Sequence, residues 1–356
     1  MNGCVEMAGD ALNEANRDGD HFEEERFVVF LAPNAQGTYA VGVDVGGTNI
    51  RGGVITPDGK KLSISKKDAR ASEGLAVVQQ VIIEVIEEAI SLANVPRQEL
   101  MGIGMGVPGR HKSAEGIVLN SPNFAGWNNV QLLLPIENHF GVGVYMRNDV
   151  KTASLGEYKF GAGKGHHWVV MITLGTGIGG SLVVDGNLML GSGEGFAEVG
   201  HMTVAPDGRL CACGNHGCWE AMAGRDAIIE RAWRALQSGR PSMLGEMTGY
   251  DLKKIDPAKI AEAASDGDRL SREVLEETAM WIGIGVANLI QVYNPDLFII
   301  GGGISQAGDL LFSTIKHTVN WRAKMVPAHT VKIVNSLLGD DAGIFGGASL
   351  VFAALK

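Results

Sequence analysis

The stretch TYAVGVDVGGTNIRGGVI, residues 38–55, contains two alternating runs of apolar and β-branched residues joined at Gly46-Gly47. Alternation with a period of two predicts β-strands, and paired glycines predict the tight turn between them. The stretch HWVVMITLGTGIGGSLVVDGN, residues 167–187, repeats the same plan of strand, glycine loop and strand. The repetition predicts that the chain is built from two related halves.

Each strand pair is followed by helical and then strand patterns. Residues 74–94 carry apolar side chains at helical spacing, and the run at 99–109 is typical of a buried strand that enters a glycine loop. In the second half, a long buried helix from Leu270 precedes the strand at 297–300. We therefore expect an α/β fold with two related domains, a mixed sheet in each, and a small-molecule site in the interdomain cleft.

The expected domain limits follow from this order. Residues 1–38 form an acidic N-terminal extension, 39–160 a smaller N-terminal domain, and 161–341 a larger C-terminal domain. A final helix begins near Ala342, and 342–356 is expected to return to the N-terminal domain. Residues 1–26 hold eight acidic residues and two arginines, a net charge of −6, which is typical of a solvated segment.

Composition excludes several classes of protein. The 356 residues carry a net charge of −10, which argues against a nucleic-acid partner because such partners require a basic face. No stretch resembles a signal peptide or is long enough to span a membrane, so we expect a cytoplasmic protein with no membrane partner. In a reducing cytoplasm, clustered cysteines more often bind a metal than form disulfides.

The glycine turns at residues 44–49 (DVGGTN) and 173–180 (TLGTGIGG) each follow an apolar strand and place Thr beside Gly. Glycines let backbone N–H groups converge on an anion, and Asp44 at the strand end could hold Mg²⁺. Either turn alone could be an ordinary hairpin, but the pair is typical of two loops that hold phosphates. Two formal G-x-G-x-x-G matches lack the strand-to-helix context of a dinucleotide site, and there is no P-loop.

Asn148-Asp149 lies between an expected strand and an expected helix. Asp149 could be a helix N-cap. Alternatively, its carboxylate could stand at the ligand-binding edge of the sheet and take a proton from a substrate hydroxyl. The residues themselves leave both interpretations open.

The stretch CACGNHGCWE, residues 211–220, contains three of the four cysteines of the chain. Cys211, Cys213 and Cys218 have the spacing of a structural zinc site, which requires a fourth ligand. Spacing slightly favours His216, but a ligand inside so short a turn would have to fold back on it. His201, ten residues before Cys211, is the other candidate. A disulfide is the rival hypothesis, and it leaves one thiol unpaired.

Taken together, these motifs resemble the ROK group (repressors, open reading frames, kinases) of bacterial sugar kinases, from about Tyr39 to the C-terminus. The two glycine turns resemble its phosphate loops, and LFIIGGGIS resembles its adenosine-site strand and loop. AEVGHMTV together with CACGNHGCWEAMAG resembles its signature. The resemblance implies a two-domain actin-like or hexokinase-like ATPase fold with mixed β-sheets and an interdomain cleft.

The resemblance also implies a role for each matching residue. Asp149 is the expected general base, and the expected sugar-binding residues are Gly109, Asn123, Asn148, Glu198, His201 and Glu220. The expected ATP and Mg²⁺ positions are Asp44, Gly46, Gly47, Thr48, Asn49, Gly175, Thr176, Gly177, Gly301, Gly302 and Gly303. The implied ligands of a structural Zn²⁺ are His201, Cys211, Cys213 and Cys218. One imidazole nitrogen of His201 on the metal would aim the other at a sugar hydroxyl.

The implied reaction is transfer of the γ-phosphoryl group of MgATP to the 6-hydroxyl of a hexose, with glucose as the first expectation. The same residues would serve an N-acylhexosamine kinase acting on N-acetylmannosamine or N-acetylglucosamine, or a fructo- or mannokinase. Asn49 stands where the family often has Lys, and Phe196 stands where a smaller residue is common. Both departures bear on phosphate contact and sugar specificity.

A sugar-responsive repressor of the same group is the alternative from another class, and it would need a basic N-terminal helix-turn-helix. Residues 1–38 are acidic and lack two helices with apolar periodicity, which disfavours a repressor. The resemblance further implies a homodimer or a higher homo-oligomer. The sequence does not distinguish ATP from polyphosphate as donor.

Overall fold

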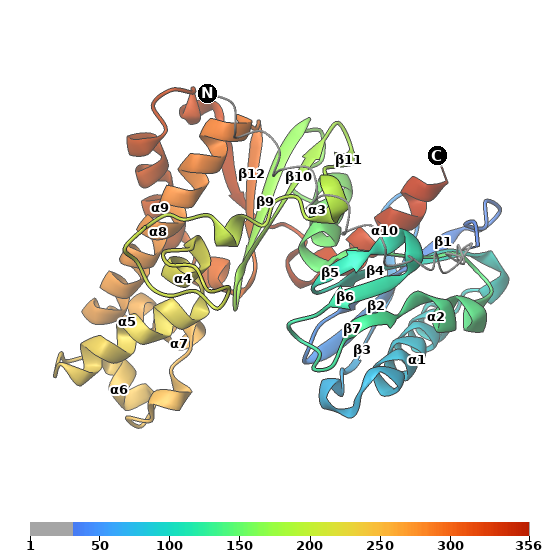
Figure 1. Ribbon diagram of the computed structural model, residues 1–356, viewed down its shortest axis with the longest axis horizontal. Helices are drawn as coiled ribbons and strands as arrows, with labels where there is room; N and C mark the ends of the chain where they lie inside the picture. Colours follow the sequence, from blue (N-terminus) through green and yellow to red (C-terminus); the bar gives the residue numbers. More distant parts are fainter. Residues whose placement is uncertain (1–30, 356) are drawn as a thin grey trace, which may run out of the picture.

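The computed structural model of the protein describes residues 31–355. Two five-stranded mixed sheets stand side by side with helices around them (Figure 1). The predicted α/β class with a mixed sheet in each half is confirmed. Most of the expected acidic extension, residues 1–30, and the last residue, Lys356, lie outside the described residues.

The first sheet has the strand order β3-β2-β1-β4-β8. Strands β1, β2 and β3 are antiparallel neighbours, whereas β4 and β8 continue the sheet in parallel with β1. The bounds are β1 Tyr39–Val45, β2 Asn49–Ile55, β3 Lys61–Asp68, β4 Leu100–Val107 and β8 Val144–Asn148. The predicted pair of strands at the first glycine turn is therefore joined by a third strand that the sequence pattern did not reveal.

The second sheet repeats this plan in the order β11-β10-β9-β12-β13. Strands β9, β10 and β11 are antiparallel, and β12 and β13 run parallel to β9. The bounds are β9 Trp168–Leu174, β10 Ile178–Val184, β11 Asn187–Leu188, β12 Leu297–Gly301 and β13 Lys332–Asn335. Both sheets thus have the same order and the same mixture of directions, as related halves require.

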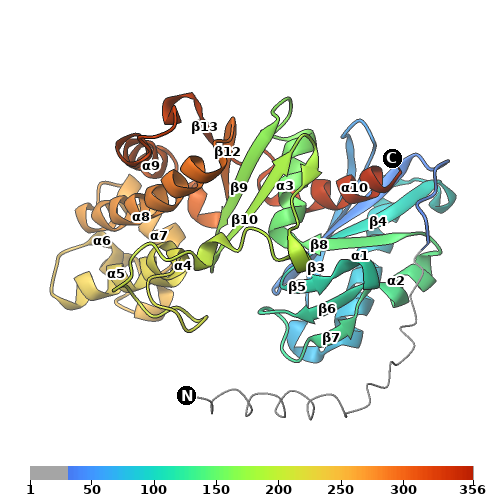
Figure 2. The ribbon, with the colours of Figure 1, turned by 45° about the horizontal axis from the view of Figure 1, so that its top comes forward.

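A small antiparallel sheet, β5-β6-β7, covers one end of the first half. Its strands are β5 Arg110–Lys112, β6 Ile117–Asn120 and β7 Asn128–Gln131. They are short and mostly polar, so they lack the alternating apolar pattern by which strands are recognised in a sequence. Figure 2 shows this sheet beside β8, facing the space between the two halves.

The helices divide between the two halves. Helices α1 Leu75–Ala93 and α2 Leu133–Phe140 lie between strands of the first sheet in sequence, and α3 Asp149–Phe160 follows its last strand, β8. The second half carries α4 Trp219–Ala223, α5 Arg225–Gln237, α6 Met243–Met247, α7 Pro257–Ser265, α8 Arg269–Tyr293 and α9 Asp309–Arg322. The last helix is α10 Ala342–Ala354. None of the helices within residues 31–355 is long and apolar enough to cross a membrane.

Helix α10 packs closely on β1, β4 and α3, between the two sheets (Figure 2). Glycines make this approach possible. A Cβ at Gly42 on β1 would lie 1.7 Å from the carbonyl oxygen of Ile344, and one at Gly104 on β4 would lie 1.9 Å from that of Gly347. Because backbone lies against backbone, the final helix and α3 hold a fixed position relative to the first sheet.

Candidate active site and metal centre

A pocket of about 210 Å³ lies between the two sheets, at the ends of β1 and β9. The first half contributes the carboxylates of Asp44 on β1 and Asp149 at the start of α3. The second half contributes Thr173 at the end of β9 and Gly302 after β12. The segment before α10 adds Ser336, Gly339 and Asp340. The pocket therefore brings together acidic, hydroxyl and glycine backbone groups from both halves.

Asp149 is the first residue of α3, and its Oδ1 accepts a hydrogen bond from the Val150 amide at 2.9 Å. The N-cap is Asn148, whose Oδ1 accepts from the amides of Val150 at 3.1 Å and Lys151 at 3.3 Å. The interpretation of Asp149 as the N-cap is therefore wrong. Asn148 performs the capping, so helix geometry alone does not require an acid at the next position.

Two half-buried carboxylates share this pocket, and each carries a raised pKa. Burial, together with the nearby charge of Asp149, raises the pKa of Asp44 to about 6, against a smaller lowering by Arg51. Burial also raises the pKa of Asp149, while its bond to the Val150 amide and the charge of Lys151 act in the opposite direction. Carboxylates in such surroundings are suited to accept a proton or to bind a divalent cation.

The first glycine turn joins β1 to β2, and the Gly46 amide donates to the Asn49 carbonyl at 3.0 Å. Gly47 lies against Asn123, because a Cβ there would be 2.9 Å from the Asn123 Cβ. Thr48 is exposed, and Asn49 is partly exposed. The turn thus brings one expected phosphate position and one expected sugar position into contact.

The second glycine turn joins β9 to β10 and packs against a different set of neighbours. The Gly175 amide donates to the Gly177 carbonyl at 3.0 Å, and the Glu220 Oε2 accepts from the Ile178 amide at 3.2 Å. A Cβ at Gly177 would lie 2.1 Å from that carboxylate oxygen. Glu220, expected to bind sugar, therefore also supports the turn that contains Gly175, Thr176 and Gly177.

The three glycines after β12 lie at the end of the second sheet. Gly302 has φ +86° and approaches β9, where a Cβ would lie 2.3 Å from the Leu174 carbonyl oxygen. A Cβ at Gly303 would meet no atom within 4 Å. A left-handed glycine followed by open space leaves backbone accessible at the expected nucleotide position.

The expected sugar positions come from both halves. Asn148 Nδ2 donates to the Gly109 carbonyl at 3.4 Å, so these two lie together. Glu198 is exposed, and its Oε1 lies 3.9 Å from Lys151 Nζ on the first half. His201 is exposed at the end of the turn Val199–His201.

The four expected metal ligands form one cluster. One ligand atom each from His201, Cys211, Cys213 and Cys218 lies within 4.8 Å of the others. His201 Nδ1 is 3.8 Å from Cys211 Sγ, and Cys213 Sγ is 3.6 Å from Cys218 Sγ. With Zn–S bonds of ~2.3 Å, tetrahedral geometry places neighbouring sulfurs about 3.8 Å apart. The donor set and its spacing fit a closed tetrahedral zinc site.

The structure separates the two histidine candidates. His216 is exposed, and its Nδ1 lies 3.1 Å from the Gly208 carbonyl oxygen, outside the cluster. His201 presents Nδ1 to the cysteines, which leaves its Nε2 free to face a ligand. The sulfur atoms are also much farther apart than the ~2.05 Å of a disulfide. Spacing in the sequence favoured His216, but the chain folds back to bring His201 into the cluster.

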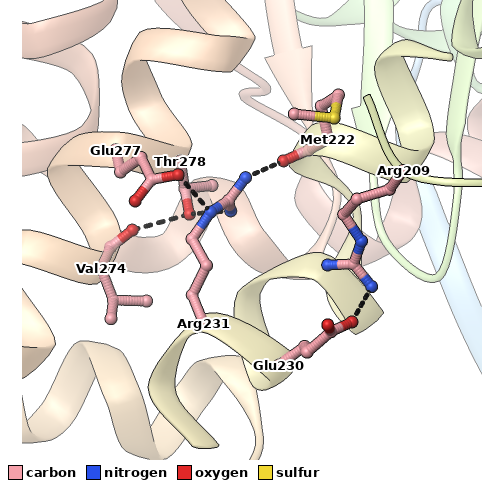
Figure 3. Close-up of polar contacts among 7 residues, drawn as sticks. All are labelled: Arg209, Met222, Glu230, Arg231, Val274, Glu277 and Thr278. Carbon is pink, nitrogen blue, oxygen red and sulfur yellow. Dashed lines mark hydrogen bonds and ion pairs between the residues drawn. The ribbon is translucent and has the colours of Figure 1, made fainter. Parts of the chain in front are cut away.

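Two arginines connect the cysteine-containing loop and α4 to helices α5 and α8 (Figure 3). Arg231 on α5 donates to Glu277 at 2.8 Å and Thr278 at 3.2 Å on α8, and also to the Met222 carbonyl in α4. Arg209, two residues before Cys211, pairs with Glu230 on α5. The position of Glu220 at the start of α4 therefore depends on contacts far from the pocket.

Several pocket residues were missed by sequence reasoning. Ser336 and Asp340 come from the segment between β13 and α10, which contains no recognised motif. Thr173 stands at the head of the second glycine turn, where its position could have marked it. Ser336 is held by Glu157 of α3, which is fully buried and accepts from the Ser336 hydroxyl at 2.5 Å and the Leu338 amide at 2.7 Å.

Comparisons with known proteins agree with this geometry. Residues 40–354 match the ROK family. The chain is 37% identical over 311 residues to a glucokinase of Thermotoga maritima, which covers 87% of this chain and 96% of that protein. It is 29% identical to a xylose repressor of Caldicellulosiruptor bescii, with 91% of this chain and 81% of that protein covered.

Among solved structures, a ROK family glucokinase of Streptomyces griseus in complex with glucose and AMPPNP superposes with a TM-score of 0.74 at 33% identity. The match covers 88% of this chain and 98% of that one. The chain belongs to the ROK family, and its two-domain actin-like fold is that of the ROK hexokinases. The predicted family and superfold are confirmed.

Proposed function

We propose that the protein is an ATP-dependent glucose kinase in which Asp149 removes the proton from the 6-hydroxyl of the sugar. The observation that carries the proposal is the carboxylate of Asp149, which shares a pocket with Asp44 and with Thr173 at the end of β9. The family membership and the glucokinase relatives support the same reaction.

The proposed chemistry assigns one task to each side of the pocket. Asp149 accepts the hydroxyl proton as the hydroxyl oxygen attacks the γ-phosphorus of ATP. The bond from the γ-phosphorus to the β,γ-bridging oxygen breaks, and ADP leaves with that oxygen. Asp44 is suited to hold Mg²⁺, which neutralises phosphate charge. The glycine turns supply backbone N–H groups to the phosphates, with Gly46, Gly47, Thr48 and Asn49 in one turn and Gly175, Thr176 and Gly177 in the other. Gly301, Gly302 and Gly303 take the adenosine side.

The sugar is held by Gly109, Asn123, Asn148, Glu198, His201 and Glu220 in this proposal. Zn²⁺ on His201, Cys211, Cys213 and Cys218 has a structural task. When bound, it would hold one ring nitrogen of His201 and leave the other for a sugar hydroxyl, and it would restrain the loop that leads to Glu220. The metal takes no part in the reacting centre. Cytoplasmic location and a homodimeric or larger assembly stay predictions, the latter to be measured by light scattering.

An ADP-coupled assay tests the proposal with glucose, mannose, fructose, N-acetylglucosamine and N-acetylmannosamine. Polyphosphate replaces ATP in a parallel series. Asp149→Asn serves as the matched variant, because it preserves the size of the side chain and removes the base. We expect turnover on glucose with ATP that drops ~10²–10⁴-fold in the variant. Sugar binding without turnover on any acceptor would overturn the kinase and favour a sugar-responsive regulator.

A further inference from the structure

Lys151 is a buried lysine whose ammonium group makes no hydrogen bond within residues 31–355. It lies in the first turn of α3, two residues after Asp149, and its side chain is 3% exposed. Within residues 31–355 its ion pair is with Glu198, at 3.9 Å, which is too long for a hydrogen bond. An ammonium group has three N–H donors, so most of its bonding capacity is left for a ligand.

Helix stability does not account for a cation at this position. The N-terminus of a helix carries partial positive charge and favours acids. The acids near Lys151 are also engaged elsewhere: Glu194 accepts from the Ser113 hydroxyl at 2.5 Å and from its amide at 3.3 Å. Asp149 accepts from the Val150 amide at 2.9 Å. These acids balance the charge of Lys151 without satisfying its donors.

His111 on β5 offers the complementary group. Its side chain is 5% exposed, and its Nε2 is buried without a hydrogen-bond partner among the described residues. Burial lowers the pKa of His111 to about 4, and the nearby charge of Lys151 acts in the same direction. The ring is therefore neutral at physiological pH. Because Nε2 has no partner, the bond of the ring to the Pro108 backbone belongs to Nδ1–H, and Nε2 is then an acceptor.

We propose that Lys151 Nζ and His111 Nε2 together bind one hydroxyl group of the acceptor sugar, other than the hydroxyl that is phosphorylated. A hydroxyl both accepts and donates, so it can accept from the ammonium and donate to the imidazole. Lys151 lies two residues after the proposed base, Asp149, and its Nζ is 3.9 Å from Glu198, which belongs to the proposed sugar site. The strand β5, which carries His111, starts directly after Gly109, whose carbonyl accepts from Asn148 Nδ2 at 3.4 Å at the start of α3. The inference rests on the proposed function and adds two sugar-binding residues to it.

Deoxy sugars test this contact directly. We would measure kcat and KM for glucose, 2-deoxyglucose, 3-deoxyglucose and 4-deoxyglucose with the wild type, Lys151→Met and His111→Phe. Lys164→Met, an exposed lysine just after α3, is the matched control. Removing the bound hydroxyl should lower kcat/KM about tenfold or more in the wild type, because buried polar groups lose their partner. In Lys151→Met and His111→Phe, removal of the same sugar hydroxyl should lower kcat/KM by less than about twofold, because these variants have already lost the contact.

If both variants lower kcat/KM by the same factor on every sugar, the proposed contact is wrong, because the residues then affect the structure of the site and not one hydroxyl. Unchanged kinetics would overturn it as well, with a bound water as the partner of Lys151. Thermal unfolding and metal content identify a variant that fails to fold, in which case His111→Gln replaces His111→Phe. If the wild type does not phosphorylate glucose, the proposed function fails. Calorimetric titration with glucose alone then still tests whether Lys151→Met weakens sugar binding.

Discussion

The two glycine turns occupy equivalent places in two sheets of the same strand order, yet their surroundings differ. The turn at Gly46-Gly47 lies against the sugar-side residue Asn123, and its strand delivers Asp44 to the pocket. The turn at Gly175–Gly177 lies against Glu220, which follows directly on the cysteine cluster. The first turn thus neighbours the pocket carboxylate Asp44, whereas the second is supported by Glu220, two residues after the proposed metal ligand Cys218. A repeated topology leaves the chemistry of each copy free to diverge.

The largest loss of stability is expected from removal of a proposed metal ligand in the second half. Cys218→Ser replaces a fully buried ligand, so we expect loss of the bound metal and a fall in unfolding free energy of about 3–5 kcal/mol. Metal content by mass spectrometry and urea unfolding would measure both. His216→Ala is the control and should keep its metal. A Cys218→Ser protein of normal metal content would contradict the assignment of the cluster.

In the first half, removal of the Asp44 carboxylate should raise the stability of the protein, whereas loss of Cys218 in the second half should lower it. Because the pKa of Asp44 is raised to about 6, its stabilising contribution is present below about pH 4 and is lost as pH rises through 6. A pKa raised from 3.8 to about 6 corresponds to ~3 kcal/mol of unfolding free energy. In Mg²⁺-free buffer, Asp44→Asn should unfold at higher temperature than the wild type at pH 8 and equally at pH 4. The variant should also lose activity.

An unchanged difference in unfolding temperature between pH 8 and pH 4 would show that Asp44 titrates normally. In that case the two halves would differ less in electrostatics than the geometry indicates.

Arg231→Met tests how far the second turn depends on the helices behind it. The substitution removes the bond to the Met222 carbonyl and the contacts to α8, so we expect about 1–3 kcal/mol of destabilisation and weaker sugar binding. Arg234→Met, on the exposed side of α5, is the matched control and should cost less than about 0.5 kcal/mol. Similar effects of both variants would mean that Arg231 contributes only surface charge.

The smallest effect is expected from two alanines within one turn. A Cβ at Gly177 meets the carboxylate of Glu220, whereas one at Gly175 meets no atom within 4 Å. Gly177→Ala should displace Glu220 and raise the KM for ATP or sugar by a factor that corresponds to ~1 kcal/mol. Gly175→Ala leaves Glu220 undisturbed, so the KM for sugar should stay close to the wild-type value. Steady-state kinetics with both substrates would measure the difference, and a larger effect of Gly175→Ala would locate the sensitive contact on the nucleotide.

Local patterns predicted the elements of greatest regularity. The strand pairs around both glycine turns, the long helix α8 and the final helix α10 were all anticipated, because each is a long run rich in apolar residues. Strands β3, β11 and β13 and the sheet β5-β6-β7 were missed. These strands are short, or are polar edge strands such as Lys61–Asp68, so partners elsewhere in the chain stabilise them more than their own pattern does.

The sequence by itself determined the α/β class, the repeated halves, the cysteine motif and the candidate base at Asp149. Only the tertiary structure brought Asp44, Asp149 and Asp340 into one pocket. It also placed His201 with the cysteines and left His216 outside, as the family resemblance implied and spacing alone did not. It alone brought Lys151 of the first half within 3.9 Å of Glu198 in the second. The physical reason is distance along the chain. Local periodicity follows from neighbouring residues, but these contacts join segments whose proximity depends on how both sheets and α10 pack.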